Sequence, residues 1–523
     1  MGIPSYFSFI VKNHSKIIKR LEQLKSINNF YLDSNSIIYD CLREISLCYN
    51  GNNTKFENLL IKKVILKLDE YIKFINPSHK TLIAFDGVAP VAKLEQQRTR
   101  RYKSYLMEKI KKNITPKEEY KTVWDKTAIT PGTKFMEKLG NKIKKHYNSK
   151  ENIIISTSEE DGEGEHKIFE YIRNNKKFHE NKTTLIYGLD ADLIMLCLNH
   201  LHISKKIYLY RETPEFIKSI NTDLEANKPY FFDIPELAKT IMEKMTGSSQ
   251  NKNQNVLHDY IFLCLLLGND FLPHFPSLNI RTSGIHILMS AYYNTLGKLK
   301  KNLSNGKKIY WVNLKILIEH LSQSEHDKLK DEYKERTKLE RRFYPQGNTK
   351  EKLFKLENIP TQKRELEKFI DPFSYNWERR YYKKLFDLDI NKAFRQSICI
   401  NYLEGLEWVL YYYTSGCIDW RWKYKYHYPP LLKDLVKFIP SWDTRMIEAN
   451  EHIPVQDIVQ LSYVLPKNSL KLLPKKIEKK LLSKMIDKYP ENCQLEWAFC
   501  KYLWESHPKL PEISLSELEN ITS

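Results

Sequence analysis

The residues of this chain that are best suited to chemistry are acids at the ends of short apolar runs. Three such runs end in an acid or directly before one: 30–33 ends at Asp33, 81–86 ends at Asp86, and 184–189 is followed by Asp190. Another acid, Asp192, follows two positions after Asp190. In an open α/β sheet, ligands bind in the crevice beyond the carboxyl ends of the strands. Acids at the ends of separate strands are therefore expected to meet in one crevice.

Two further segments can add acids to that crevice. Residues 161–166 read Asp-Gly-Glu-Gly-Glu-His, and the glycines permit a tight backbone where a helix begins, so Glu163 and Glu165 are candidates. Asp270 follows an apolar helix that is predicted at 260–267. The predicted cluster then contains seven carboxylates.

Carboxylates that share one site repel each other and raise each other's pKa values unless cations neutralise them. Hard oxygen ligands indicate Mg²⁺ or Mn²⁺ and not zinc. Two such ions can activate a water and stabilise the leaving oxygen of a phosphodiester. The alternative for any single acid is a helix N-cap or a turn former. Because the acids recur on successive strands, metal binding is favoured, and the predicted chemistry is phosphodiester hydrolysis.

A basic face follows the second of these acids closely. Pro90 is a suitable helix start, and three cations and one amide follow it at i, i+4, i+7 and i+8: Lys93, Gln97, Arg100 and Arg101. This spacing places all four on one face of a helix, where they can grip a terminal phosphate. The alternative is a solvated charged face. The position directly after Asp86 favours the phosphate pocket.

Aromatic and basic residues alternate in the segment 420–428, which begins with Trp420, Arg421 and Trp422. An extended chain would carry the rings on one side and the cations on the other. Base stacking combined with phosphate attraction suits single-stranded nucleic acid. An aromatic core strand with a solvated back explains the pattern equally well, and both interpretations stay open.

The elements that would position these residues alternate between strands and helices in the first half of the chain. We expect an α/β fold with a largely parallel sheet and flanking helices, followed by a second region that is mostly helical and rich in aromatic residues. Strands are predicted at 30–33, 81–86, 152–156, 184–189 and 206–210, and helices at 56–75 and 167–174. The expected division is a nuclease core at 1–295, a charged helical connector at 296–368, and a second region at 369–523 that closes the active site.

The composition limits the possible classes of protein. Lys and Arg total 84 against 64 Asp and Glu, which gives a net charge of +20 and a pI near 9.2, as in nucleic-acid-binding proteins. A Lys-rich codon bias explains that charge equally well. The eight cysteines include no C-x-x-C pair, so we expect a reduced, intracellular protein without structural zinc. No apolar stretch approaches the ~18 residues of a membrane span, so no membrane role is indicated.

Longer strings surround the candidate residues. They include Gly162-Glu163-Gly164-Glu165-His166-Lys167 and Gly268-Asn269-Asp270-Phe271-Leu272-Pro273, together with 1–7, 32–38, 85–93, 96–101 and 187–196. Looser strings follow in the second half, at 377–382, 404–408, 420–422 and 465–466. In this order they closely resemble the Xrn family of 5′→3′ exoribonucleases, almost from end to end.

The resemblance implies a 5′-nuclease core, similar to PIN domains, with two Mg²⁺ ions, or Mn²⁺ in their place. It implies that the metal ligands and catalytic residues are Asp33, Asp86, Glu163, Glu165, Asp190, Asp192 and Asp270. It also implies that a 5′-monophosphate pocket is formed by Lys93, Gln97, Arg100 and Arg101. The 5′ nucleotide would stack between Tyr39, which stands where the family usually has His, and either Trp420 or Trp422.

We therefore expect a processive 5′→3′ exoribonuclease that hydrolyses 5′-monophosphorylated single-stranded RNA to nucleoside 5′-monophosphates in RNA or mRNA decay. It would be a compact member without the family's long C-terminal extensions, acting as a monomer in the cytoplasm, with the nucleus as the alternative. Two rival hypotheses are a structure-specific flap endonuclease and an inactive RNA-binding relative. The presence of all seven acids argues against the inactive relative.

Overall fold

The structure is a computed structural model that describes residues 2–3, 5–116, 123–212, 218, 221–226, 228–248, 253–387, 391–448 and 453–523. A seven-stranded sheet lies in the first half of the chain, with the order β1-β7-β6-β5-β2-β3-β4. β2 to β6 pair in parallel, and β7 pairs antiparallel with both β6 and β1. The strands are β1 (Ile18–Arg20), β2 (Asn29–Asp33), β3 (Lys80–Ala84), β4 (Ile153–Ser156), β5 (Thr183–Tyr187), β6 (Lys206–Glu212) and β7 (Pro229–Asp233).

The predicted α/β class with a largely parallel sheet is confirmed, and all five predicted strands are present. β1 and β7 are not predicted from the sequence. β1 has three residues, Ile18–Arg20, two of which are cations, so it carries no apolar run. β7 begins at Pro229, and the first residue of a strand is a position that accepts Pro. Its aromatic residues at 230–232 are typical of a strand, so of these two strands β1 is the one without a local signal.

Side chains alternate between the two faces of the sheet. On β2, Phe30 and Leu32 belong to one buried core, which also contains residues of the long helix 53–75. Tyr31 points to the opposite face and belongs to the larger core. β2 is buried over its whole length, as expected for a parallel strand covered by helices on both faces.

Helices cover both faces of the sheet and form most of the second half. In the first half they are α1 (Tyr6–Asn13), α2 (Asn35–Ile45), α3 (Asn53–Ile75), α4 (Val91–Ile114), α5 (Lys134–Tyr147), α6 (Gly164–Asn174), α7 (Lys176–His179), α8 (Asp192–Asn199), α9 (Ile234–Thr246), α10 (Asn255–Leu265) and α11 (Gly284–Tyr292). In the second half they are α12 (Trp311–Gln323), α13 (Glu325–Glu340), α14 (Thr349–Glu357), α15 (Ile359–Gln362), α16 (Glu365–Ile370), α17 (Trp377–Leu385), α18 (Lys392–Thr414), α19 (Leu432–Leu435), α20 (Asp457–Val464), α21 (Lys475–Lys484) and α22 (Leu515–Thr522), with a small hairpin of β8 (Leu495–Glu496) and β9 (His507–Pro508).

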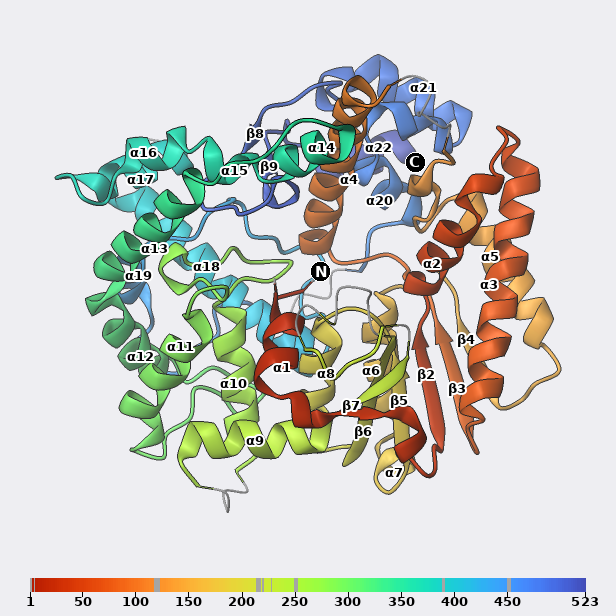
Figure 1. The fold of residues 1–523 in the computed structure, drawn as a ribbon, viewed down its shortest axis with the longest axis horizontal. Coiled ribbons are helices and arrows are strands. Elements are labelled where there is room, and N and C mark those ends of the chain that lie inside the picture. The colour runs from red at the N-terminus through yellow and green to blue at the C-terminus, as the bar shows by residue number, and fades with distance from the viewer. Residues whose placement is uncertain are drawn as a thin grey trace.

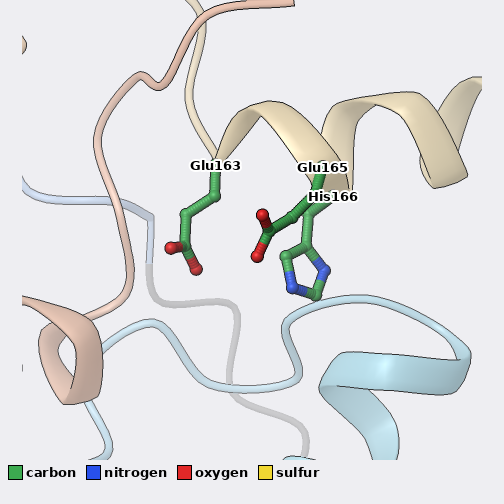
Figure 2. Close-up of side chains that lie close together, drawn as sticks. All are labelled: Glu163, Glu165 and His166. Atoms are coloured by element: carbon green, nitrogen blue, oxygen red, sulfur yellow. The ribbon is translucent and has the colours of Figure 1, made fainter. Parts of the chain in front are cut away.

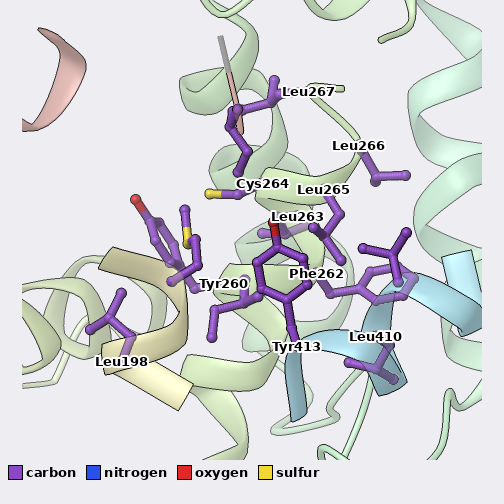
Figure 3. Packing of buried hydrophobic residues seen from close by; sticks show 14 of the residues in the cluster. Leu198, Tyr260, Phe262, Leu263, Cys264, Leu265, Leu266, Leu267, Leu410 and Tyr413 are labelled. Carbon is purple, nitrogen blue, oxygen red and sulfur yellow. The ribbon is translucent and has the colours of Figure 1, made fainter. Parts of the chain in front are cut away.

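The largest core joins the two halves of the chain. Figure 3 shows Leu198 of α8 and the apolar run 260–267 packed with Leu410 and Tyr413 of α18. α12 also contributes to this core through one face that includes Trp311. The segment 296–368 was expected to form a charged connector, but α12 packs into the interior as firmly as the helices of the first half. The proposed domain limits at 295 and 368 stay predictions.

α4 is the first-half helix on which the C-terminal part of the chain rests. It contacts α14, α20 and β9. In Figure 1, α4 rises away from the sheet toward the C-terminal helices drawn in blue. Two hydrogen bonds tie its far half to this region: Lys103 Nζ donates to Trp504 O at 2.7 Å and Lys109 Nζ donates to Asn492 Oδ1 at 2.7 Å. One helix therefore carries both the predicted phosphate pocket and the contact surface for the second region.

Within the described residues, no helix is both long and apolar enough to cross a lipid bilayer.

A buried charge network holds the second region together. Glu367 of α16 accepts two hydrogen bonds from Arg336 of α13, at 2.9 and 2.7 Å, and one from Arg364 Nε at 2.5 Å. It also accepts the Phe499 N–H at 2.9 Å, next to the β8–β9 hairpin. All three charged side chains are at most 4% exposed. Removing this carboxylate would leave Arg336 buried without its ion-pair partner, whereas Arg364 would keep its contact with Glu340 at 3.2 Å.

We expect Glu367→Gln to lower the free energy of unfolding by about 3–5 kcal/mol, because breaking a buried ion pair leaves an uncompensated charge. Denaturant unfolding followed by circular dichroism measures this change. Glu335→Gln is the matched control, since Glu335 forms an exposed pair with Lys338 on α13 and should change stability by less than about 0.5 kcal/mol. Equal effects of the two substitutions would contradict a central role for the network.

Candidate functional site

Parallel strands bring the first three acids to one edge of the sheet. Asp33 is the last residue of β2, Asp86 follows β3, and Asp190 follows β5. Because β2 lies between β3 and β5, the three carboxylates stand beyond the carboxyl ends of adjacent strands. Asp33 interacts electrostatically with both of the others. The crevice that the sequence predicts is therefore present.

The start of α6 adds three side chains, drawn in Figure 2. Glu163 precedes the first residue of the helix, and Glu165 and His166 lie in its first turn. One ligand atom of each lies within 4.8 Å of the others. His166 is a site residue that the sequence reasoning missed, although it follows Glu165 directly and lies three positions after Glu163.

His166 is held as a neutral ring. Its centroid lies 3.7 Å from that of Tyr412 on α18. Burial, followed by the charge of Lys93, lowers the pKa of His166 well below its ordinary value. Its Nδ1 atom is buried without a hydrogen-bond partner among the described residues. The imidazole therefore offers a lone pair or an N–H group to the carboxylate cluster without adding charge.

Gly164 lets the start of α6 approach the strand-end acids. Its N–H donates to Asp86 Oδ1 at 2.7 Å. A Cβ atom at this position would lie only 2.7 Å from Asp33 Oδ1 and 3.2 Å from Ala84 O. Asn35 Nδ2 holds the other oxygen of Asp86 at 2.5 Å. The tight backbone predicted for the glycine-rich segment is confirmed, and its reason is this close approach.

The last two acids come from α8 and from the loop after α10. Asp192 is the first residue of α8 and is 4% exposed. Asp270 lies in the loop that follows α10, against the basic helix α4, where Lys93 Nζ lies 2.7 Å from its Oδ2. Asp192 interacts electrostatically with Asp190 and Asp270. All seven acids predicted from the sequence are thus brought into one electrostatically coupled cluster.

Burial and mutual repulsion set the protonation of this cluster. Burial, then the charges of Asp86 and Asp190, raises the pKa of Asp33 well above its ordinary value. Burial, then Glu163 and Asp190, does the same for Glu165. Burial, then Asp190 and Asp270, raises the pKa of Asp192 to about 8. Without added cations, the site holds protons that carboxylates normally lose.

The donor set fits divalent cations. Seven carboxylates supply hard oxygen ligands of the kind that Mg²⁺ and Mn²⁺ prefer. Asp192 Oδ1 is buried and has no hydrogen-bond partner among the residues that the structure describes. A buried carboxylate oxygen without a partner carries a free-energy penalty that a bound cation would remove. Such a cation would also oppose the mutual repulsion that raises the pKa values.

Lys93 lies inside the carboxylate cluster. Its Nζ atom is 2.6 Å from Glu163 Oε1 and 2.7 Å from Asp270 Oδ2. Burial opposes the charge of the ammonium, but Asp270 and Glu163 outweigh it and raise the pKa of Lys93 well above its ordinary value. The sequence places Lys93 in the phosphate pocket. The structure pairs it with two of the acids, at the boundary between that pocket and the cluster.

The other three residues of the basic face lie one turn and two turns further along α4. Arg101 donates to Gln97 Oε1 at 3.3 Å and to Thr130 Oγ1 at 2.7 Å. Burial, then repulsion by Arg100, lowers the pKa of Arg101 to about 10, so it stays charged near neutral pH. Arg100 itself is exposed. No carboxylate is paired with Arg100 or Arg101 in the described parts of the chain, which leaves both charges available to an anion.

One cavity of about 660 Å³ contains both chemical groups. All four residues of the basic face line it. Six of the seven acids, all except Asp192, also line it: Asp33, Asp86, Glu163, Glu165, Asp190 and Asp270. The acid cluster and the basic face, which are predicted separately from the sequence, therefore line the same cavity.

The aromatic residues are arranged differently from the expectation. Tyr39 lines the cavity and is 37% exposed. Trp422 does not line it, because its ring packs 5.3 Å from that of Trp408 in the core. Trp420 does not line it either, although its carbonyl accepts the Val91 N–H at the start of α4 at 2.9 Å. The aromatic residue of the second region that lines the cavity is Trp504, for which the sequence gives no local signal.

The alternating segment 420–428 is not a strand. Tyr424 is buried in the largest core, and Trp422 and Tyr426 pack against it. Lys425 and His427, which alternate with aromatic residues in the sequence, are exposed. The core interpretation, which the sequence left open, therefore applies to this segment beyond Trp420. The stacking roles of Tyr39 and Trp420 stay predictions.

Two family models cover most of the chain. The one described as XRN 5′-3′ exonuclease N-terminus matches residues 1–213, which include β1 to β6 and six of the acids. The one described as Xrn1 helical domain matches residues 250–370 and 370–522, which include Asp270 and the second region.

Named relatives extend over the same range. A 5′-3′ exoribonuclease 2 of Arabidopsis thaliana is 26% identical over 99% of this chain and 66% of its own length. A 5′-3′ exoribonuclease 2 homolog of Drosophila melanogaster is 25% identical, over 99% of this chain and 70% of its own. A human 5′-3′ exoribonuclease 1 is 28% identical over 99% of this chain, which corresponds to 34% of the human protein. The chain thus spans between one third and 70% of the length of these relatives.

The raised pKa of Asp192 makes stability depend on pH in a defined direction. The folded carboxyl keeps its proton up to about pH 8, whereas the unfolded one loses it near pH 3.8. Unfolding therefore releases a proton between these values, and this group destabilises the fold increasingly as pH rises. Asp192→Asn removes the effect. In EDTA, the variant should gain stability over the parent by up to about 1.4 kcal/mol per pH unit between pH 5 and 7.

Denaturant unfolding of parent and variant at pH 5, 6, 7 and 8 measures this difference. Asp331→Asn is the control, because Asp331 lies on the surface of α13 with 61% of its side chain exposed and should show no such trend. Saturating Mn²⁺ should reverse the sign for Asp192, since the ionised carboxylate is then the form that binds. A parent-to-variant difference that is constant from pH 5 to 8 would contradict the assignment.

Proposed function

The chain belongs to the Xrn family of 5′-3′ exonucleases, and on this basis we propose that it removes nucleoside 5′-monophosphates one at a time from 5′-monophosphorylated single-stranded RNA. The observation that carries this proposal is the single cavity whose walls are the acid cluster and the basic face of α4. A nuclease needs only the acids. The basic face adds a site for a terminal phosphate and so gives the cavity a direction.

The basic face binds the 5′ end. Arg100 and Arg101 bring planar guanidinium groups that suit bidentate contacts with phosphate oxygens. Gln97 adds an amide whose oxygen is already fixed by Arg101. Gln97 lies one helical turn from Lys93, and Arg100 and Arg101 lie two turns from it. Lys93 is itself within 2.7 Å of two of the acids. The next phosphate of the strand then reaches the acids, and the first nucleotide is the unit that is cut off.

The acids hold the cofactor. We propose that two Mg²⁺ ions, or Mn²⁺ in their place, are bound by Asp33, Asp86, Glu163, Glu165, Asp190, Asp192 and Asp270. When bound, the ions supply charge neutralisation and electrophilic activation for phosphodiester hydrolysis. Lys93 holds Glu163 and Asp270 by its ion pairs, which limits their motion. Gly164 and Asn35 fix Asp86 from two sides.

The end group is selected by the size and charge of the pocket. Arg101 already donates one hydrogen bond from Nη1 to Gln97 and one from Nη2 to Thr130. A capped or triphosphorylated end would have to place additional phosphates beyond Arg101. Tyr39 lines the same cavity and is proposed to stack on the first base. The preference for RNA rests on the relatives, which are named exoribonucleases. Action as a monomer and a cytoplasmic location stay predictions.

The experiment that tests the proposal is a product analysis on single-stranded RNAs that differ only in the 5′ group. With Mg²⁺, the 5′-monophosphate RNA should yield mononucleotides from its 5′ end, and the 5′-hydroxyl and 5′-triphosphate RNAs should be cut at least tenfold more slowly. Asp190→Asn should abolish turnover. Internal cuts near a duplex junction would instead identify a flap endonuclease. RNA binding without any Mg²⁺-dependent product would identify an inactive relative.

Arg100→Ala should reduce the preference for 5′-monophosphate over 5′-hydroxyl RNA by roughly tenfold or more, since a charge-assisted contact is worth about 1.5–3 kcal/mol. The ratio of kcat/KM for the two RNAs measures it. Lys111→Ala is the matched control, because Lys111 is an exposed cation on the same helix that does not line the cavity. If Arg100→Ala slows both RNAs equally, the phosphate pocket lies elsewhere.

A further inference from the structure

Arg211 lines the same cavity as the acids and the basic face, and the proposed function leaves it without a role. It is the sixth residue of β6 and is paired in register with Tyr230 of β7. Its side chain is on the sheet face that carries Leu209, where α1 packs.

The Arg211 side chain is half-buried and forms no ion pair within the described residues, although the charge of Asp190 is close enough to favour its charged form. Its Nε and Nη1 atoms are shielded from solvent and have no hydrogen-bond partner within the described residues. The neighbouring Glu212 accepts a hydrogen bond from Tyr71 at 2.7 Å instead. Burial lowers the pKa of Arg211 to about 10, with Asp190 opposing this, so the group stays charged near neutral pH. Arg336, by contrast, is buried with Glu367 as its partner.

An aromatic ring supports the guanidinium. Arg211 Cζ lies 3.9 Å from the ring centroid of Phe7 on α1. The Phe7 ring is itself fixed edge-on against Phe232 at 5.9 Å. Stacking of this kind stabilises the cation but uses none of its N–H donors. The group is therefore held in place by stacking, and Nη2, which is not among its solvent-shielded atoms, is the end that a ligand in the cavity can reach.

A charged, preorganised and unpartnered guanidinium is suited to an anion. Buried polar groups are normally satisfied, so the missing partner indicates a ligand that arrives from the cavity. The planar N–H groups of arginine match the two free oxygens of a phosphodiester. In a cavity proposed to hold RNA, the phosphate backbone is the anion at hand.

The order of strands places this site relative to the cut. α4 follows β3, the acids Asp33 and Asp190 follow β2 and β5, and Arg211 is at the end of β6. Since the order in the sheet is β3-β2-β5-β6, Asp86, after which α4 begins, stands at one end of the row of strand-end acids, and Arg211 stands beyond Asp190 at the other end. Neighbouring strands are about 4.8 Å apart, so Arg211 stands close to Asp190 on its far side.

We propose that Arg211 forms a second phosphate subsite, which binds the phosphodiester immediately 3′ of the one that is cut. The subsite rests on the proposed function, because it assumes that the 5′-phosphate occupies α4 and the scissile phosphate lies at the acids. It gives the strand a defined path from α4 across the sheet edge to α1. A substrate with only one internucleotide linkage would not reach it.

The test is equilibrium binding of fluorescent 5′-phosphorylated tetraribonucleotides, with Ca²⁺ in place of Mg²⁺ to neutralise the acids. Each RNA carries one uncharged methylphosphonate, at the first or at the second linkage. In the parent, the change at the second linkage should weaken binding roughly tenfold or more. In Arg211→Gln, the same change should have no further effect, since the partner of that phosphate is already missing. The change at the first linkage should weaken both proteins alike.

Two variants separate binding from folding. Arg211→Lys should restore part of the dependence on the second linkage. Arg211→Gln should leave the thermal unfolding midpoint unchanged or higher, because it removes a half-buried charge that has no ion-pair partner among the described residues. A purely structural arginine would lower that midpoint on substitution. Arg20→Gln is the matched control: Arg20 lies on β1 of the same sheet, is paired with Glu225, and should not alter RNA binding.

The outcomes distinguish this inference from the proposed function. If the parent does not prefer 5′-phosphorylated over 5′-hydroxyl RNA, the proposed function fails, and the subsite fails with it. If the parent shows that preference but parent and Arg211→Gln respond equally to the second linkage, only the subsite is overturned. Loss of the response to the first linkage in Arg211→Gln would place Arg211 at the scissile phosphate and would also overturn the assignment.

Discussion

The mutual repulsion of buried carboxylates is the constraint on which the rest of this structure depends. Burial and like charges raise the pKa of Asp33, Glu165 and Asp192, so the cluster is unfavourable without positive charge. Within the chain, Lys93 supplies that charge at hydrogen-bonding distance. Divalent cations are the natural complement, because hard oxygen donors are what Mg²⁺ prefers. Strain of this kind is tolerated where it is needed for function, and a large surrounding core holds it in place.

α4 links this electrostatic requirement to the architecture. Its first turns carry Lys93 to the acids and present Arg100 and Arg101 to the same cavity. Its outer face packs against α20, α14 and β9, so the second region is built on the helix that forms the pocket. The Lys103 bond to the Trp504 carbonyl brings an aromatic side chain of that region to the cavity. The basic face and the contact surface for the second region therefore belong to the same helix.

Local patterns predicted the residues whose environment is set by the backbone nearby. The buried run of β2 and the acid that ends it follow from apolar residues beside Asp33, and the four positions on α4 follow from helical periodicity. Patterns failed where a side chain has two chemically reasonable environments. Trp422 alternates with cations in the sequence, yet its ring packs on Trp408 because helix α18 passes behind it. β1 was missed because an edge strand of three residues obtains its pairing from the existing sheet. β7 lies inside the sheet, and its aromatic run at 230–232 is a signal that the sequence analysis overlooked.

The sequence by itself determined the set of acids, the basic face after Asp86 and the parallel α/β class, because strand ends and helix faces are local consequences of residue order. Only the tertiary structure decided that these form two walls of one cavity, that His166 belongs to the cluster and that Trp504 reaches it. It alone showed that, among the described residues, Arg211 has no hydrogen-bond or ion-pair partner. The physical reason is that burial and pairing depend on residues hundreds of positions apart, which no local spacing records.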